Sequence, residues 1–206
     1  MTDQEGDRHS ERLRRQQEVF EQALRAFREL QQPAGEAQVL LSLGRLGIER
    51  RDWAMATEHY ERALDIYREL NDRHGQAQAL LALGLVYAAR GAVAEALDAY
   101  ELALNLYGQL EDLRGQAQVL NNLGLLYAEL GRQSEAVAAY QAALEFTRHL
   151  EDEQGEGRAL GNLGYVYATA GEMERARIYW HQALRKLTPG SSEYEQVRAW
   201  LQGGEG

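Results

Sequence analysis

Residues 115–130 read GQAQVLNNLGLLYAEL, and this stretch decides the fold because related stretches occur at three other places. These are GEAQVLLSLGRLGIER at 35–50, GQAQALLALGLVYAAR at 75–90 and GEGRALGNLGYVYATA at 155–170. The Leu-Gly pair at 123–124 recurs at 43–44, 83–84 and 163–164, so the period is 40 residues. A constant period of this size is typical of solenoids, in which each repeat packs only against its neighbours.

Each repeat contains two segments with helical periodicity. In the first, apolar residues recur at i, i+3, i+4 and i+7, as at Leu120, Leu123, Gly124 and Tyr127. The second segments have the same spacing and read ATEHYERALDIYREL, AEALDAYELALNLYGQL, EAVAAYQAALEFTRHL and ERARIYWHQALRKL. The pattern therefore predicts an all-α chain built from antiparallel helix pairs.

Glycine and aspartate mark the expected helix ends. Gly91, Gly131 and Gly171 stand where a first helix must stop and turn, and Arg51 takes this place in the first repeat. Asp72, Asp112 and Asp152 precede the following first helices and are N-cap candidates. Near the end of the sequence, Ser192 and Glu195 have capping-box spacing.

These signals predict the following organisation. Residues 1–9 form a disordered tail, 10–34 a half-repeat helix, 191–202 a capping helix that covers the last core with Val197, Trp200 and Leu201, and 203–206 a loose end. The full repeats span 35–74, 75–114, 115–154 and 155–190. We further expect the glycines of the Leu-Gly pairs to pack against Tyr60, Tyr100, Tyr140 and Trp180 of the second helices, small against large.

The repeats resemble those of tetratricopeptide-repeat (TPR) proteins, in the long-period form found in Pins/LGN-like adaptors and bacterial repeat proteins. The residues that carry the resemblance are Leu123, Gly124, Tyr127, Ala136, Tyr140 and Ala143. Gly47 and Trp180 depart from the family pattern, and the period exceeds the usual 34 residues. The resemblance implies a right-handed superhelical solenoid whose first helices line an inner groove.

Composition argues against several functions. The net charge of −10 and a single lysine, Lys186, disfavour nucleic acid and anionic membrane surfaces. The absence of cysteine favours a reducing compartment, so we expect a cytoplasmic protein. The histidines lack metal-ligand spacing, and no nucleotide or hydrolase motif occurs. We therefore expect no enzyme, no catalytic residue, no metal and no cofactor.

The resemblance places a second stripe of the first helices in the groove. The stripe consists of Gln38, Leu41 and Arg45, then Gln78, Leu81 and Leu85, then Gln118, Asn121, Asn122 and Leu125, and finally Arg158, Asn162 and Tyr165. An asparagine amide both donates and accepts, so it can pair with the backbone of a bound peptide. Alternatively the asparagines are solvated or bond a neighbouring repeat. The leucines either form a patch for a partner or are covered by neighbouring first helices.

We therefore expect a protein-protein interaction scaffold that binds an extended or helical segment, acidic or apolar, of a partner protein. Two alternatives remain. The chain could self-assemble into homo-oligomers through its ends, near Leu13 and Phe20 or at Trp200, or it could be the regulatory binding subunit of a larger system.

Overall fold

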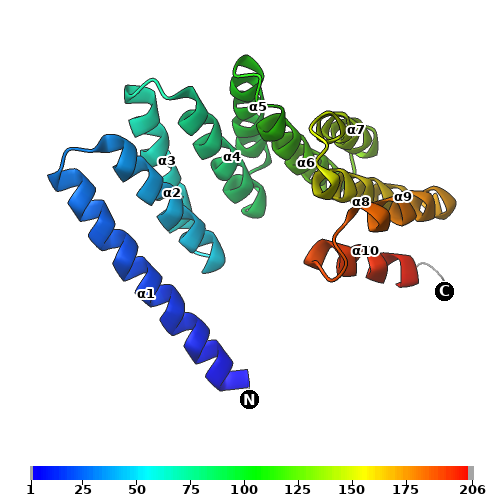
Figure 1. The fold of residues 1–206 in the computed structure, drawn as a ribbon, viewed down its shortest axis with the longest axis horizontal. Coiled ribbons are helices and arrows are strands. Elements are labelled where there is room, and N and C mark those ends of the chain that lie inside the picture. Colours follow the sequence, from blue (N-terminus) through cyan, green and yellow to red (C-terminus); the bar gives the residue numbers. More distant parts are fainter. Residues whose placement is uncertain (1, 204–206) are drawn as a thin grey trace. The chain divides into compact units, whose positions relative to one another are not determined.

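The computed structural model describes the backbone of residues 2–203 and the side chains of residues 11–203, and every regular element there is an α-helix. The helices are α1 (Thr2–Glu29), α2 (Pro33–Glu49), α3 (Trp53–Glu69), α4 (Arg73–Ala89), α5 (Val93–Gln109), α6 (Leu113–Glu129), α7 (Gln133–His149), α8 (Glu153–Thr169), α9 (Met173–Lys186) and α10 (Ser192–Gly203) (Figure 1). The predicted all-α repeat solenoid is confirmed. It divides into two compact units, Met1–Leu106 and Tyr107–Gly206.

The helix ends form as the sequence predicts. The carboxylates of Asp72, Asp112 and Asp152 each accept a hydrogen bond of 2.9 Å from the backbone N–H three residues later. Gly91, Gly131 and Gly171 have φ angles of 73°, 70° and 79°. Glycine adopts this left-handed conformation without steric cost. The turns after α1, α2, α3, α5 and α7 instead use Gln31, Arg51, Asn71, Glu111 and Glu151 at positive φ.

The Leu-Gly glycines lie against large rings, as expected. A Cβ atom would lie 2.4, 2.5, 2.7 and 2.5 Å from the facing ring if added to Gly44, Gly84, Gly124 and Gly164 respectively. The facing rings belong to Tyr60, Tyr100, Tyr140 and Trp180, all nearly inaccessible to solvent. Each glycine therefore allows its first helix to approach the second helix of the same repeat.

A second glycine contact of this kind was not predicted. It joins the first turn of a first helix to the last turn of the preceding second helix. A Cβ would lie 2.4 Å from Phe27 if added to Gly35 and 2.3 Å from Tyr67 if added to Gly75. The equivalent distance from Gly115 to the ring of Tyr107 is 2.4 Å. These contacts join consecutive repeats.

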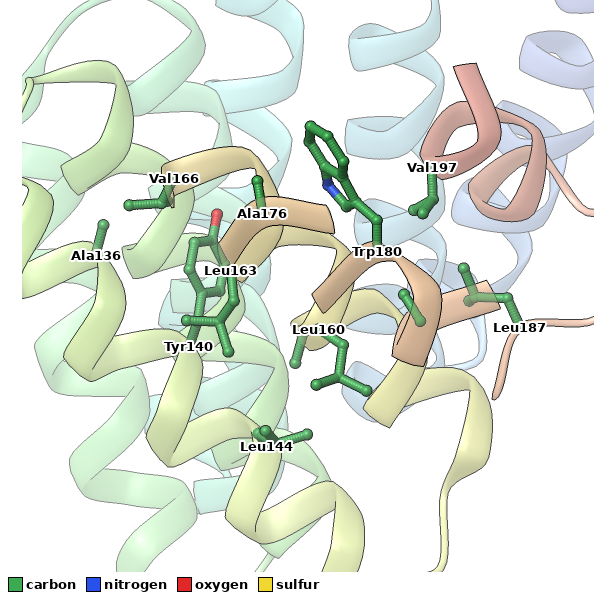
Figure 2. Packing of buried hydrophobic residues seen from close by; sticks show 12 residues of the cluster. Ala136, Tyr140, Leu144, Leu160, Leu163, Val166, Ala176, Trp180, Leu187 and Val197 are labelled. Carbon is green, nitrogen blue, oxygen red and sulfur yellow. The ribbon is translucent and has the colours of Figure 1, made fainter. Parts of the chain in front are cut away.

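The C-terminal helix covers the last core, as predicted, but its cap differs. Val197 is 3% exposed and belongs to a cluster with Leu160 and Trp180, against which Trp200 and Leu201 also pack (Figure 2). At the N-terminus of α10, the hydroxyl of Ser191 caps the helix by accepting a hydrogen bond of 3.2 Å from the Tyr194 N–H. Ser192 is therefore not the cap that its spacing to Glu195 suggested, and its own hydroxyl donates to Glu193.

The predicted chain ends also need correction. Helix α1 begins at Thr2, not at residue 10, so residues 2–9 are helical and not a disordered tail. Leu13 is buried, with 4% of its surface exposed, and is not available at an open end. Gly203 is the last residue of α10, and the rest of the expected loose end, 204–206, lies outside the described residues.

Candidate functional site

The second unit contains a cavity of about 1110 Å³ whose walls come mainly from α6 and α8, with smaller contributions from α7 and α10. The first helices of the third and fourth repeats contribute all seven of their predicted groove residues to its lining: Gln118, Asn121, Asn122, Leu125, Arg158, Asn162 and Tyr165. Residues of α7, among them Tyr140 and Thr147, also line it. The 40-residue period brings the lining residues together because equivalent positions on consecutive first helices face the same way.

The three asparagines have different environments. The Asn121 amide donates a hydrogen bond of 3.0 Å to the Ala117 carbonyl, one turn earlier on α6. Its side-chain oxygen is buried and has no hydrogen-bond partner within the described part of the chain. Asn122 and Asn162 are half-buried. Neither side-chain amide makes a hydrogen bond to another of the residues that the structure describes. Solvation therefore does not explain Asn121, while Asn122 and Asn162 keep their full bonding capacity toward the cavity.

Aromatic and aliphatic side chains form the apolar part of the cavity. Leu125 is 47% exposed and Tyr165 is 41% exposed. The Tyr165 ring lies 5.1 Å from that of Trp200, which in turn lies 6.2 Å from the ring of Trp180. Trp200 was predicted as a capping residue and as a possible contact in self-assembly but not as a groove residue, yet it lines the cavity. Its second role depends on how α10 folds back onto α8, which periodicity does not specify.

Charged groups of both signs line the same cavity. Arg114 and Arg158 come from the N-terminal halves of α6 and α8, and Glu129 ends α6. Hydrogen bonds from its own backbone N–H and from the Ser192 hydroxyl, together with the charge of Arg158, lower the pKa of Glu193. Burial, followed by the charge of Glu129, raises the pKa of Tyr140, so the phenol stays neutral. The two arginines favour an acidic ligand group near the beginnings of α6 and α8.

The predicted groove residues of the first unit form a less uniform surface. Gln38, Arg45 and Gln78 are exposed, Leu41 is half-buried, and Leu85 is 38% exposed. Leu81 is only 5% exposed, so its side chain is buried and does not offer the groove surface that was predicted for it. The equivalent residue in the fourth repeat, Gly161, is also buried, and a Cβ added to it would lie 2.8 Å from Val197 of α10.

A second hollow, of about 540 Å³, lies along α1 in the first unit. Its lining consists of Glu11, Arg12, Arg15, Gln16, Val19 and Phe20. Among the residues described, no group of three or more metal-ligating side chains could hold an ion. No helix within residues 2–203 combines the length and the apolar character that crossing a membrane requires.

The model of the tetratricopeptide-repeat family matches three overlapping stretches of the chain, residues 35–109, 75–149 and 115–188. A search of the curated proteins found no match.

Several solved structures have a similar fold. BtubC (BKLC) from P. vanneervenii matches with a TM-score of 0.80 and 23% identity over 93% of this chain and 82% of that one. Rap in complex with competence and sporulation factor gives 0.71 and 18% identity, over 84% of this chain and 48% of Rap. NprR in complex with its cognate peptide NprX gives 0.69 and 16% identity, over 95% and 54%. The chain thus spans about half the length of Rap and NprR.

Proposed function

Because the chain belongs to the tetratricopeptide-repeat family, we propose that it is a non-catalytic scaffold that binds a segment of a partner protein. The proposed site is the cavity of the second unit, which we call the α6–α8 groove. The observation that carries the proposal is that all seven predicted residues of α6 and α8 line this one cavity. The groove offers amides, two arginines and an apolar wall to the same ligand.

The chemistry of the lining supports a peptide ligand. The free amides of Asn122 and Asn162 can donate to a backbone carbonyl and accept from a backbone N–H, whatever side chains the ligand carries. Each such hydrogen bond contributes only about 0.5–1.5 kcal/mol. Additional affinity would come from burying Leu125, Tyr165 and Trp200 and from pairing Arg114 and Arg158 with acidic groups.

Two structural relatives add weaker support. The Rap structure is a complex with competence and sporulation factor, and the NprR structure contains the peptide NprX. Because their sequence identity to this chain is only 18% and 16%, the similarity shows a shared fold and not a shared ligand. A peptide or protein segment is nevertheless the ligand class that best fits both the lining and these relatives. The prediction of a cytoplasmic location continues to depend only on the absence of cysteine.

An affinity pull-down from a lysate of the source cells tests the proposal. The bait variant combines Asn122→Ala and Asn162→Ala, which removes amides from the groove without changing its charge. A matched control is Gln141→Ala, which removes an exposed amide from α7 outside the groove lining. Equal helicity of all baits must be shown first by circular dichroism.

We expect a partner that wild type and Gln141→Ala retain and the double variant loses. The retained partner would then be cut into overlapping peptides to find the bound segment. If the double variant retains every partner as well as wild type does, the α6–α8 groove is not the binding site.

A further inference from the structure

The two arginines of the α6–α8 groove differ from most cations of the second unit because they have no salt bridge. Arg114 and Arg158 are exposed, line the groove, and make no salt bridge or hydrogen bond with any residue that the structure describes. The cations that do pair with a glutamate, at 2.7 to 3.3 Å, are Arg132, Arg148, Arg175, Arg177, Lys186 and Arg198. Two cations without a counter-charge therefore face one cavity.

A carboxylate without a counter-charge lies at the opposite end of the groove. Glu129, the last residue of α6, lines the groove and makes no salt bridge or hydrogen bond within residues 11–203. The next cation in the sequence, Arg132, pairs with Glu135 at 2.8 Å and lies over the Tyr127 ring. The other lining residues near the C-terminal ends of α6 and α8 are uncharged: Gly131, Gln133, Thr169 and Ala170.

The two signs of charge lie at opposite ends because α6 and α8 run in the same direction. Helix α7 packs against both of them and is joined to each by a short turn, so the chain reverses twice between α6 and α8. Arg114 is the second residue of α6, and Arg158 lies in the second turn of α8. The helix dipoles add to this polarity, because helix N-termini are partially positive and C-termini partially negative.

The acidic groups near the arginines already have other hydrogen-bond donors. Asp152 also lines the groove at this end, but its carboxylate caps α8 by accepting from the Gly155 N–H at 2.9 Å. Glu193 of α10 is close enough for the charge of Arg158 to help lower its pKa. Its carboxylate accepts from its own backbone N–H and from the Ser192 hydroxyl and makes no salt bridge with Arg158. The positive end therefore keeps an excess of positive charge.

The distance between the two ends defines the length of segment that can reach both. At a rise of about 1.5 Å per residue, Arg114 and Glu129 are separated by about 22 Å along α6. Arg158 occupies the position of α8 that is equivalent to Gln118, so it lies about 16 Å from the level of Glu129. An extended chain covers these distances with about five to seven residues. The groove between the ends is lined by neutral side chains, among them Asn122, Leu125, Asn162 and Tyr165.

We propose that the α6–α8 groove binds an extended partner segment that carries an acidic and a basic side chain about five to seven residues apart. The acidic side chain would pair with Arg114 and Arg158, and the basic one with Glu129. The inference rests on the proposed function of the groove and adds the charge pattern of its ligand. Reversing the segment would bring like charges together, so the charges also fix its direction in the groove.

A peptide library displayed on phage tests the pattern without knowledge of the partner. Random peptides of about twelve residues, long enough to span the groove, would be selected on the immobilised full chain at low salt. Enriched peptides would then be synthesised, and their affinities measured by fluorescence polarisation. We expect them to contain an acidic and a basic residue at the stated spacing. They should also bind the Asn122→Ala and Asn162→Ala double variant more weakly than wild type.

Paired substitutions in protein and peptide then assign each charge. We expect Arg114→Gln with Arg158→Gln, and separately Glu129→Gln, to weaken binding about two- to fivefold for each lost pair. A peptide whose acidic residue is replaced by alanine should no longer distinguish the arginine variant from wild type, and the basic residue should couple to Glu129 in the same way. Arg185→Gln and Glu145→Gln are matched controls, because both residues are exposed and lie outside the groove lining.

The outcomes separate this inference from the proposed function. The charge pattern is rejected if the enriched peptides lack the two charges, or if the neutralised variants bind them as tightly as the controls do. If such peptides still bind the asparagine double variant more weakly than wild type, the groove proposal stands and only the charge pattern fails. If no peptide is enriched, or every enriched peptide binds the double variant as tightly as wild type, the groove proposal fails and the charge pattern fails with it.

Discussion

A glycine in the middle of a helix destabilises it by about 0.5–1 kcal/mol relative to alanine, so Gly124 must be compensated by a contact that alanine would prevent. That contact is with Tyr140, which is 1% exposed and would lie 2.7 Å from an added Cβ. The packing of the two helices in each repeat therefore depends on the glycine of the Leu-Gly pair having no Cβ methyl group.

Substituting this glycine should overpack the contact. We expect Gly124→Ala to lower the free energy of unfolding by about 1–3 kcal/mol, because the Tyr140 ring or the helix backbone must move. The matched control is Gly108→Ala in α5, where the nearest atom would be 3.9 Å away and the substitution should be neutral or stabilising. Thermal or urea unfolding measures both. A Gly124→Ala protein as stable as Gly108→Ala would contradict the packing role.

The missing N-cap of α2 provides a prediction of increased stability. Gln32 makes no side-chain cap bond, although Asp72, Asp112 and Asp152 cap the equivalent helices. We expect Gln32→Asp to stabilise the protein by about 0.5–2 kcal/mol through a bond to the Gly35 N–H. Asp72→Ala should destabilise it by a similar amount. Opposite shifts of the thermal midpoint would verify this, and equal effects of the two variants would contradict it.

At the scale of elements, the sequence predicted the helices well because their signals are local. The 40-residue period, the capping aspartates and the turn glycines each depend on residues within one hairpin. Predictions failed where neighbouring helices decide the outcome. Leu81 follows the groove pattern but is buried, and the Ser192 cap position was wrong by one residue. Periodicity gives the direction of a side chain but not what covers it.

The groove could be predicted in part for the same reason. Equivalent positions on α6 and α8 line one cavity, as the period implies. The contributions of Trp200 and Thr147 come from α10 and α7, whose approach to the groove the period does not encode.

Glu156 connects three helices in the second unit. Its carboxylate pairs with Arg148 of α7 at 3.0 Å and with Lys186 of α9 at 3.0 Å, while its side chain is 13% exposed. In the first unit, Glu36 pairs with Arg28 of α1 at 2.7 Å in the same way. These ion pairs therefore connect consecutive repeats, as the contacts of Gly35, Gly75 and Gly115 with the preceding second helices also do.

The Glu156 pairs should make stability sensitive to acid. Burial alone would raise the pKa of Glu156, but the bonds to Arg148 and Lys186 outweigh it and lower the pKa. A depressed folded-state pKa stabilises the protein above the unfolded value of about 4.3 and loses that effect as the pH falls through the folded value. We expect Glu156→Gln to cost about 1 kcal/mol or less at pH 7, because both partners are partly exposed.

Urea unfolding as a function of pH measures this effect. Below about pH 5 the difference between wild type and Glu156→Gln should shrink toward zero. Glu145→Gln, which changes an exposed carboxylate on α7, is the control and should parallel wild type. A difference that grows in acid would contradict the assignment.

At the scale of the whole molecule, the remaining alternative is self-assembly through the ends. In the four repeats, the second-helix position that packs against the first helix is Ala56, Ala96, Ala136 and Ala176, all fully buried. The equivalent residue of α1 is Gln16, beside Arg12 and Arg15 in the α1 hollow. Covering this face with another apolar helix would bury polar groups at a cost. At the C-terminal end, Trp200 already contacts Tyr165 and Trp180 within the chain.

We therefore expect the protein to be a monomer. Light scattering should give a mass of 23.2 kDa that stays constant across a dilution series. The net charge of −10 acts in the same direction, because like-charged chains repel each other at low salt. A mass that rises with concentration would contradict the expectation. Val19→Glu would then identify the surface, since Val19 is 61% exposed in the α1 hollow. Restoration of the monomer by this variant would establish α1 as an assembly face and leave the α6–α8 groove to be tested separately.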